Sequence, residues 1–302
     1  MENAMKTIGF VGLGHMGLPM AINLIKAGYQ VTGYDLQPTA LQHFSQAGGS
    51  IAHNAHELAQ DKDVLITMLQ TGQQVLEVCH SNNGLFQAAK KGALFIDCST
   101  IDVNSSRELH HLAKQHLLQV VDAPVSGGVA GATAGTLTFM VGGEEEAFDA
   151  AKPILATIGQ KIIYTGTAGS GQAAKICNNM ILGISMIAIS EAFILAEQLQ
   201  LSPQKLFEVV SNASGQCWAM TKYAPVPGIL ENVPANNDYK PGFAAAMMLK
   251  DLLLSQDSAR SVNLETPLGA KATQMYQHFI DQGLGESDFS AIIKLIAQGK
   301  EV

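Results

Sequence analysis

TIGFVGLGHMGLPMAINLIKAGYQVTGYD, residues 7–35, is the stretch that decides the fold of this chain. An apolar run over 7–11 is typical of a buried strand, and G-x-G-x-x-G follows it directly. A helical run over 19–27 and a second apolar run over 30–35 come next. This order of strand, glycine turn, helix and strand is the fingerprint of a dinucleotide-binding unit. Its glycines allow a tight turn and a close approach of backbone to pyrophosphate, which free N–H groups at the helix start can bind.

Asp35 indicates which dinucleotide is bound. It ends the second apolar run, where a carboxylate accepts hydrogen bonds from ribose hydroxyls and repels a 2′-phosphate. The next three residues, 36–38, include no arginine that could pair with such a phosphate. We therefore expect NAD rather than NADP, and we assign His15 no catalytic role. The expected cofactor contacts in this stretch are Gly12, Leu13, Gly14, His15, Met16, Gly17 and Asp35.

The rest of the sequence falls into two parts, one in which strand and helix patterns alternate and one in which all patterns are helical. Helical stretches separate further apolar runs at 63–68, 93–97, 119–123, 138–142 and 162–164. Strands that alternate with helices predict an α/β fold with a Rossmann-type, doubly wound parallel sheet. After Gly171 the patterns are all helical, at 172–200, 203–213, 244–262, 267–282 and 288–298. We expect a NAD-binding domain over 1–167 and an all-helical substrate and dimerisation domain over 168–302, begun by a long interdomain helix.

Composition excludes several classes of protein. With 47% hydrophobic residues and a net charge of −8, the 302-residue chain is neither disordered nor suited to nucleic acid. Four cysteines without a C-x-x-C pair predict reduced thiols and no metal site. The apolar stretch 180–196 is short and interrupted by polar residues, so we expect a buried helix and no membrane partner. The N-terminus lacks a signal-peptide pattern, which favours a cytoplasmic protein. Low charge and long apolar helices are compatible with a homodimer or homotetramer.

Two motifs carry candidate chemistry. Lys175 and Asn179 are four residues apart on the long helix and share one face. A desolvated lysine can accept a proton in a metal-free alcohol dehydrogenase, although a surface lysine with a packed stem is the alternative. In DAPVSGG, residues 122–128, Ser126 and the N–H groups of Gly127 and Gly128 could hold a carboxylate, or form a plain glycine turn.

Over nearly its whole length the chain resembles the β-hydroxyacid dehydrogenase family. The matching motifs are GFVGLGHMGLPMA (9–21), DAPVSGG (122–128), GSGQAAKICNN (169–179) and MLKDLLL (248–254). The resemblance implies that Lys175 is the general base, that Asn179 orients the substrate, and that residues 126–128 hold its carboxylate. It also implies further substrate contacts from Trp218, Tyr223, Phe243 and Asp251, and further cofactor contacts from Leu69, Gln70, Gln74, Thr100 and Lys250. Gln70 and Gln74 depart from the Pro and Asn that the family often has, which affects cofactor contacts rather than the reaction.

Residues 214–243 resemble the branch of that family that oxidises (S)-3-hydroxyisobutyrate to methylmalonate semialdehyde in valine breakdown. The alternatives are small hydroxyacid reductases of the tartronate semialdehyde, glyoxylate or 3-hydroxypropionate type. A 6-phosphogluconate dehydrogenase would carry Lys-x-x-His-Asn where this chain has Lys175-Ile-Cys-Asn178-Asn179. An inactive scaffold relative would lack the lysine. We therefore predict a NAD-dependent oxidoreductase that acts on a small hydroxyacid.

Overall fold

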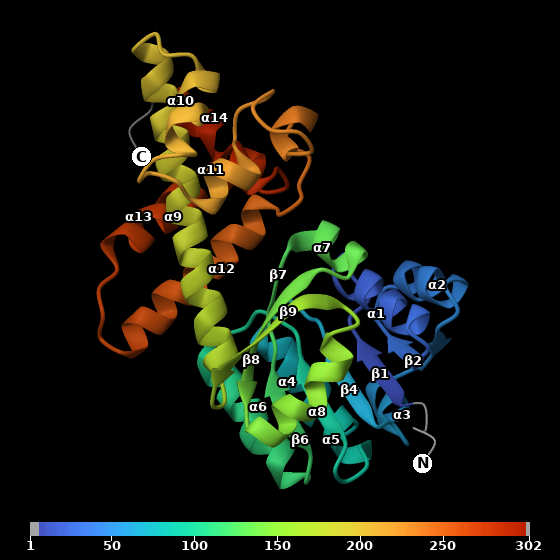
Figure 1. The fold of residues 1–302 in the computed structure, drawn as a ribbon. Coiled ribbons are helices and arrows are strands. Elements are labelled where there is room, and N and C mark those ends of the chain that lie inside the picture. Colours follow the sequence, from blue (N-terminus) through green and yellow to red (C-terminus); the bar gives the residue numbers. More distant parts are fainter. Residues whose placement is uncertain (1–5, 300–302) are drawn as a thin grey trace. The chain divides into compact units, whose positions relative to one another are not determined.

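The computed structural model describes residues 6–299 and divides the chain into two compact units (Figure 1). The first unit ends at Lys175 and the second begins at Ile176, so the division falls inside the long helix α9 (Ser170–Gln198). The boundary expected from the sequence, after residue 167, precedes this helix.

The first unit is built on one nine-stranded sheet. The strand order is β3-β2-β1-β4-β5-β6-β8-β7, and β9 pairs with β8. Six neighbouring strands run parallel, as predicted for a Rossmann-type fold: β3, β2, β1, β4, β5 and β6. In contrast, β8 runs antiparallel to both β6 and β7. The strands are β1 (Thr7–Val11), β2 (Gln30–Tyr34), β3 (Ser50–Ile51), β4 (Val64–Thr67), β5 (Leu94–Asp97), β6 (Gln119–Asp122), β7 (Val125–Ser126), β8 (Leu137–Gly143) and β9 (Gly159–Gly166).

The predicted doubly wound α/β fold with a mainly parallel sheet is confirmed, and the parallel order ends at β8, which is antiparallel to β6 and β7. The connection from β7 to β8 contains only the short helix α7 (Gly128–Ala134). A parallel crossover needs about a dozen residues or more, so this shorter connection returns the chain antiparallel. The short strands β3 and β7 were not predicted, because each has only two residues, too few to show the alternation of apolar and polar side chains that marks a strand.

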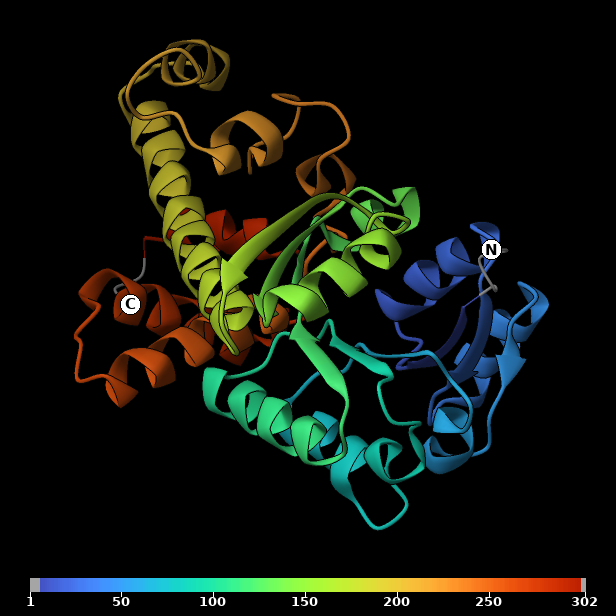
Figure 2. The same cartoon turned by 60° about the horizontal axis from the view of Figure 1, so that its bottom comes forward.

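Helices cover both faces of this sheet, as the view in Figure 2 shows. Ile66 of β4 belongs to one apolar cluster, together with residues of α1 and α8. Its neighbour Leu65 belongs to the other, with residues of α3, α5 and α6. Successive strand residues point to opposite faces, which places one cluster on each side of the sheet. The helices are α1 (Gly17–Lys26), α2 (Pro38–Gln46), α3 (Ala55–Ala59), α4 (Gly72–His80), α5 (Leu85–Ala88), α6 (Val103–Gln115), α7 and α8 (Glu145–Leu155).

The second unit is helical throughout its regular elements, as predicted. Its core gathers large apolar side chains from α9, α12, α13 and the C-terminal turns. The proline-rich stretch 217–241, predicted to be no continuous helix, holds only a short helix and one 3₁₀ turn. The elements after α9 are α10 (Pro203–Val210), α11 (Trp218–Tyr223), η1 (Pro234–Asn237), α12 (Ala245–Ser261), α13 (Pro267–Phe279), η2 (Ile280–Leu284), η3 (Phe289–Ala291) and α14 (Ile292–Ala297).

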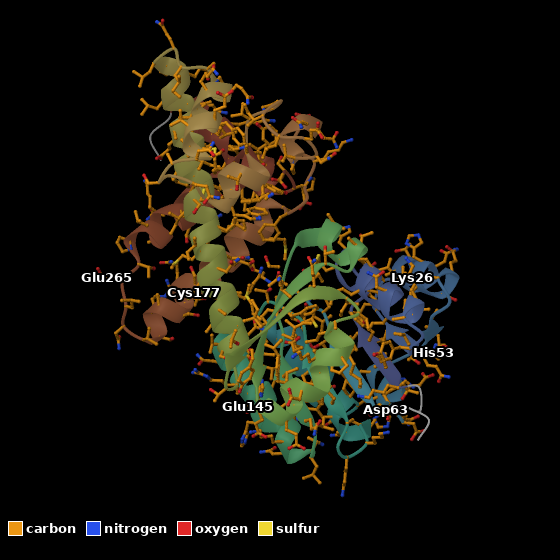
Figure 3. All side chains as sticks on the ribbon, viewed as in Figure 1. Lys26, His53, Asp63, Glu145, Cys177 and Glu265 are labelled. Atoms are coloured by element: carbon orange, nitrogen blue, oxygen red, sulfur yellow. The ribbon has the colours of Figure 1, made fainter. Side chains whose placement is uncertain are left out.

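Among residues 6–299, α9 is the one helix long and apolar enough to cross a membrane. Its most apolar window is 44% buried within the chain. Met186, Ile189 and Phe193 lie in the core of the second unit, which is what a core helix of a globular protein requires. The four cysteines are free; Cys79 and Cys98 are buried, whereas Cys177 lies exposed on α9 (Figure 3).

Candidate functional site

The glycine turn after β1 has the geometry that the fingerprint requires. Gly12 has a φ of +91°, and a Cβ there would lie 2.3 Å from the Met68 carbonyl oxygen. A Cβ on Gly17 would lie 1.8 Å from the Gly12 carbonyl oxygen. A Cβ on Gly14 would meet nothing within 4 Å, and Gly14 is exposed. The first and third glycines therefore close the turn onto the sheet, while the second leaves backbone open for a ligand.

The structure brings this turn together with Asp35. The Leu13 N–H donates to Asp35 Oδ2 at 2.6 Å, and the Gln37 N–H donates to Oδ1 at 2.8 Å. The Leu13 side chain is buried beneath the turn, Met16 is half-buried, and His15 is exposed. The half-buried carboxylate is thus held beside the glycine turn, where a ribose would have to approach.

The expected cofactor contacts after β4 and β5 lie on two adjacent strand ends. Leu69 is half-buried, and its N–H donates to Ser99 Oγ at 2.9 Å. Gln70 is exposed and Thr100 is half-buried. These positions follow parallel strands at the carboxyl edge of the sheet, where ligands of such folds bind.

Gln74, one of the two departures from the family pattern, makes hydrogen bonds at the start of α4. Its Oε1 accepts a hydrogen bond from the Gln70 N–H at 3.1 Å, and its N–H donates to Thr71 Oγ1 at 3.2 Å. This reciprocal pattern resembles a capping box at the start of α4. Gln74 is exposed, so it remains a predicted cofactor contact that also caps a helix.

Asp97, at the end of β5, is a buried carboxyl that the sequence analysis did not single out. Its Oδ1 accepts hydrogen bonds from Thr67 Oγ1 at 2.8 Å and from the Ser99 N–H at 3.1 Å. Among the described residues, its Oδ2 has no hydrogen-bond partner. Burial raises the pKa of Asp97 to about 6, and the Asp122 carboxylate adds to the rise. Asp122 is the register partner of Asp97 on the neighbouring strand β6.

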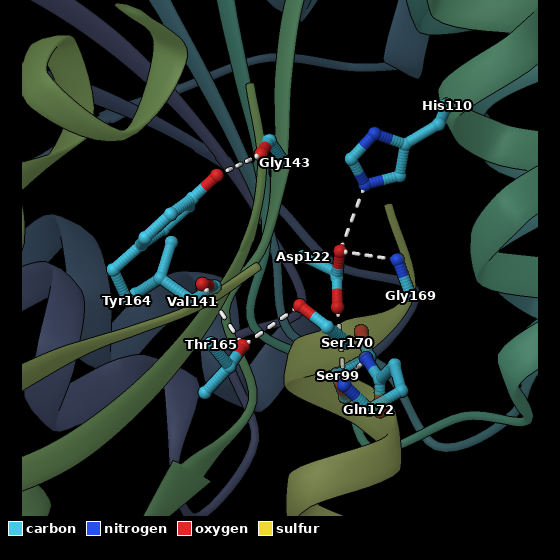
Figure 4. Close-up of polar contacts among 10 residues, drawn as sticks. All are labelled: Ser99, His110, Asp122, Val141, Gly143, Tyr164, Thr165, Gly169, Ser170 and Gln172. Carbon is cyan, nitrogen blue, oxygen red and sulfur yellow. Dashed lines mark hydrogen bonds and ion pairs between the residues drawn. The ribbon is translucent and has the colours of Figure 1, made fainter. Parts of the chain in front are cut away.

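Asp122 holds the start of α9 (Figure 4). The Gly169 N–H donates to Oδ1 at 2.9 Å, and the Gln172 N–H donates to Oδ2 at 3.0 Å. His110 Nε2 lies 2.9 Å from Oδ1, in an ion pair if the imidazole is protonated. Asp122 is 1% exposed and His110 is 4% exposed. A distant carboxylate thus satisfies N–H groups at the helix start that have no partner within the helix.

A second side chain ties the same helical turn to β5. Gln172 Nε2 donates to the Ser99 carbonyl at 2.7 Å, and its Oε1 accepts from the Ile101 N–H at 3.1 Å. A Cβ on Gly171 would lie 2.4 Å from the Met140 carbonyl oxygen, so only glycine allows this approach. Lys175, three residues after Gln172, is 7% exposed. The backbone that carries Lys175 is therefore fixed to the carboxyl ends of two strands.

Ser126, Gly127 and Gly128 form the turn between β7 and α7. Gly127 has a φ of +135° and Gly128 a φ of +60°, conformations that favour glycine. Ser126 is half-buried, and Gly127 is exposed. The turn therefore lies at least partly at the surface, and carboxylate binding there remains a prediction.

In the second unit, the structure brings Asn179 together with the Lys-Asp pair of α12. Asn179 Nδ2 donates to Asp251 Oδ2 at 2.5 Å, and Asn178 Nδ2 donates to Asn179 Oδ1 at 2.9 Å. Lys250 Nζ lies 3.8 Å from Asp251 Oδ1. Asn179 and Asp251 are buried, whereas Lys250 is half-buried. A buried, polar cluster thus spans α9 and α12 in this unit.

Two of the three predicted aromatic contacts, Tyr223 and Phe243, pack against Phe289, a residue that the sequence analysis missed, and the third, Trp218, packs on Tyr223. Trp218 and Tyr223 stack with ring centroids 5.2 Å apart. Phe289 lies 5.3 Å from Tyr223 and 5.7 Å from Phe243. The Tyr223 hydroxyl donates to Asp288 Oδ2 at 2.9 Å. Burial, with the Asp288 carboxylate adjacent, raises the pKa of the Tyr223 hydroxyl, so this phenol remains a donor.

Two family profiles together match almost the whole chain. Residues 7–166 match the NAD-binding domain of 6-phosphogluconate dehydrogenase. Residues 169–296 match a family described as NAD-binding of NADP-dependent 3-hydroxyisobutyrate dehydrogenase.

Several known proteins are similar over nearly their full length. A probable 3-hydroxyisobutyrate dehydrogenase of Mycobacterium tuberculosis is 48% identical over 289 residues, covering 96% of this chain and 97% of the relative. A NAD-dependent L-serine dehydrogenase of Pseudomonas aeruginosa is 44% identical over 291 residues, covering 96% and 98%. A solved structure of M. tuberculosis 3-hydroxyisobutyrate dehydrogenase with L-serine matches at a TM-score of 0.92, covering 97% of this chain and 99% of that chain.

Proposed function

Since the chain belongs to the 3-hydroxyisobutyrate dehydrogenase family of NAD-binding oxidoreductases, we propose that it oxidises (S)-3-hydroxyisobutyrate to methylmalonate semialdehyde, a reaction of valine breakdown. The observation that carries the proposal is Lys175, a buried lysine on a helical turn fixed by Asp122 and Gln172. We further propose a cytoplasmic homodimer or homotetramer, in keeping with its composition.

The nucleotide turn fits NAD because its crowded glycines exclude side chains and Asp35 stands beside it. When bound, NAD⁺ supplies the acceptor for the hydride that leaves the substrate carbinol carbon. The Asp35 carboxylate favours ribose hydroxyls and disfavours a 2′-phosphate, so NAD is favoured over NADP, although residues 169–296 match a family of NADP-dependent 3-hydroxyisobutyrate dehydrogenase. Leu69, Gln70, Gln74, Thr100 and Lys250 are the remaining proposed cofactor contacts.

The proposed chemistry needs one base and one anchor from the chain. Neutral Lys175 Nζ takes the hydroxyl proton as the carbinol C–H bond breaks, and it becomes an ammonium. Ser126, with the N–H groups of Gly127 and Gly128, binds the substrate carboxylate. Asn179, whose amide is already oriented by buried Asp251, orients the reacting hydroxyl.

L-Serine is the second candidate substrate, and it is favoured by the 44% identical L-serine dehydrogenase. L-Serine and (S)-3-hydroxyisobutyrate are both 3-hydroxy acids, and an ammonium in the first replaces a methyl group in the second. The Trp218–Tyr223 stack favours the methyl group, because its faces are apolar and its phenol is already paired with Asp288. We therefore rank 3-hydroxyisobutyrate first.

Steady-state NADH formation with a panel of acids tests the proposal. The panel comprises (S)- and (R)-3-hydroxyisobutyrate, 3-hydroxypropionate, glycerate, L-serine and threonate, with NADP⁺ in parallel. We expect the highest kcat/KM for the (S)-isomer with NAD⁺. Preference for glycerate or threonate would overturn the substrate while keeping the reaction class, and preference for NADP⁺ would overturn the interpretation of Asp35.

A further inference from the structure

Asp288 is a buried carboxylate that the proposed chemistry does not use. It is 0% exposed and lies at the start of η3. Its Oδ2 accepts hydrogen bonds from the Tyr223 hydroxyl at 2.9 Å, the Gly242 N–H at 2.9 Å and the Phe243 N–H at 3.1 Å. Its Oδ1 accepts from the Ser290 N–H at 3.0 Å and the Ser290 hydroxyl at 2.6 Å. Burial of a carboxylate is unfavourable unless such donors compensate it.

Three of these donors belong to one segment, residues 217–243, which we call the aromatic loop. Tyr223 lies near its start, whereas Gly242 and Phe243 form its end. One carboxylate oxygen therefore joins both ends of the aromatic loop to the C-terminal part of the chain. A Cβ on Gly242 would lie 2.6 Å from the Tyr223 hydroxyl oxygen, so glycine is what allows the two ends to meet there.

Backbone hydrogen bonds continue this attachment on both sides of Asp288. The Asp288 N–H donates to the Tyr239 carbonyl at 2.9 Å, and the Phe289 N–H donates to the Phe243 carbonyl at 2.9 Å. Phe289 also packs against the rings of Tyr223 and Phe243. The Trp218 ring stacks on Tyr223 and is 52% exposed. Asp288 therefore fixes Tyr223 by a hydrogen bond, and Tyr223 in turn supports the partly exposed Trp218 ring by stacking.

We propose that Asp288 is a positioning residue for substrate selectivity: it fixes the aromatic loop so that the Trp218–Tyr223 stack recognises the branch methyl group of the substrate. The proposal rests on the proposed function, which assigns the aromatic side chains to the substrate. A pocket that accepts one methyl group discriminates by about 10–200-fold, and only if its wall keeps its place. Loss of the hydrogen bonds at Asp288 should therefore reduce discrimination more than it reduces turnover.

Asp288→Asn is the direct test, because it replaces one acceptor oxygen by an N–H donor that faces other donors. The measured quantity is kcat/KM for (S)-3-hydroxyisobutyrate divided by kcat/KM for 3-hydroxypropionate, which lacks the methyl group. We expect this ratio to fall by about fivefold or more, mainly through a higher KM for the methyl substrate. Tyr223→Phe removes a single donor and should lower the ratio in the same direction by a smaller factor.

Two control variants make matched changes at side chains of the second unit, Asp238 within the aromatic loop and Tyr276 on α13, that are not among the described donors to Asp288. Asp238→Asn neutralises an exposed carboxylate, and asparagine tolerates the φ of +47° there. Tyr276→Phe removes a buried hydroxyl that donates to the Phe289 carbonyl at 3.0 Å. Both should leave the ratio unchanged, and only Tyr276→Phe should lower stability.

Trp218 provides a readout that is independent of catalysis, because it is the single tryptophan of the chain. Asp288→Asn should shift the Trp218 emission to longer wavelength and increase its quenching by acrylamide, whereas Asp238→Asn should change neither.

The inference is overturned if Asp288→Asn, or Tyr223→Phe where the first variant does not fold, keeps the wild-type ratio. It is also overturned if kcat/KM falls equally for both substrates, because that result indicates a general structural role. A wild-type enzyme without preference for the methyl substrate contradicts the proposed function itself, and that outcome is seen before any variant is made.

Discussion

Asp122 in the first unit and Asp288 in the second perform similar tasks with different partners. Each is buried, Asp122 at the end of β6 and Asp288 just before η3, and each accepts hydrogen bonds from backbone N–H groups of a segment far away in sequence. Asp122 also contacts an imidazole, that of His110, whereas the described donors to Asp288 are backbone amides and the hydroxyls of Tyr223 and Ser290. Asp122 fixes a helical turn, and Asp288 fixes a loop.

The difference indicates that the two regions affect different properties of the enzyme: turnover in one case and substrate selectivity in the other. The turn fixed by Asp122 precedes Lys175, the proposed base, so a substitution that disrupts this turn should lower kcat. The loop fixed by Asp288 carries the proposed aromatic substrate contacts, so a substitution that releases this loop should change substrate selectivity. Variants that change kcat without changing the selectivity ratio, or the reverse, test this difference between the two regions.

The largest effect is expected for Lys175→Ala. Without the proton acceptor, kcat should fall by about 10²–10⁴-fold, because general base catalysis typically contributes that much. The affinity for NAD⁺, measured by isothermal titration calorimetry, should stay near the wild-type value. Lys161→Ala, at an exposed position of β9, is the matched control and should keep full turnover. Near wild-type turnover in Lys175→Ala would remove the proposed base.

The next effect is expected for Asp122→Ala. The substitution leaves His110 and the N–H groups of Gly169 and Gln172 buried without this partner, which should lower the free energy of unfolding by about 3–5 kcal/mol. It should also lower kcat, because the turn before Lys175 loses its attachment. Urea denaturation gives the stability, and the exposed ion pair of Lys114 and Glu144 provides the control, where Lys114→Ala should cost at most about 1 kcal/mol. Full stability in Asp122→Ala would show that Gln172 alone holds the helix start.

A smaller, pH-dependent effect is expected at Asp97, the neighbour of Asp122. Its pKa is raised from 3.8 to about 6, so the folded protein binds the proton more tightly than the unfolded chain does. Stability from this carboxyl is therefore present below about pH 4 and is lost as the pH rises through about 6. The side-chain amide of the Asp97→Asn variant does not titrate. The free energy of unfolding of the wild type, minus that of the variant, should fall by up to about 3 kcal/mol between about pH 4 and pH 7. A difference that is constant with pH would show that Asp97 is ionised throughout.

Local sequence patterns predicted the parts of the molecule that neighbouring residues define. The glycine turn, the alternating strands and the long helix follow from local periods and from glycine chemistry. Asp122 accepts hydrogen bonds from residues 47 and 50 positions away, and Asp288 from residues 46 and 65 positions away. No local pattern marks such pairs, although Asp122 and Gln172 stood inside motifs that the sequence analysis quoted.

Long-range contacts also decide the sheet and the aromatic loop. The antiparallel strand β8 depends on which strand it meets, and a short apolar run does not encode that choice. The prolines of the aromatic loop predicted an interruption of the helix, but the closure of its two ends depends on Asp288 and Phe289.

The most direct test of the account is a comparison of kcat/KM for (S)-3-hydroxyisobutyrate and L-serine with NAD⁺ in the wild-type enzyme. In the proposed mechanism both acids use the same base and the same carboxylate anchor, so the comparison isolates the side group that the aromatic loop is proposed to contact. We predict a clear preference for (S)-3-hydroxyisobutyrate, by about tenfold or more. A preference for L-serine would contradict it, because the stacked aromatic wall would then not select the methyl group.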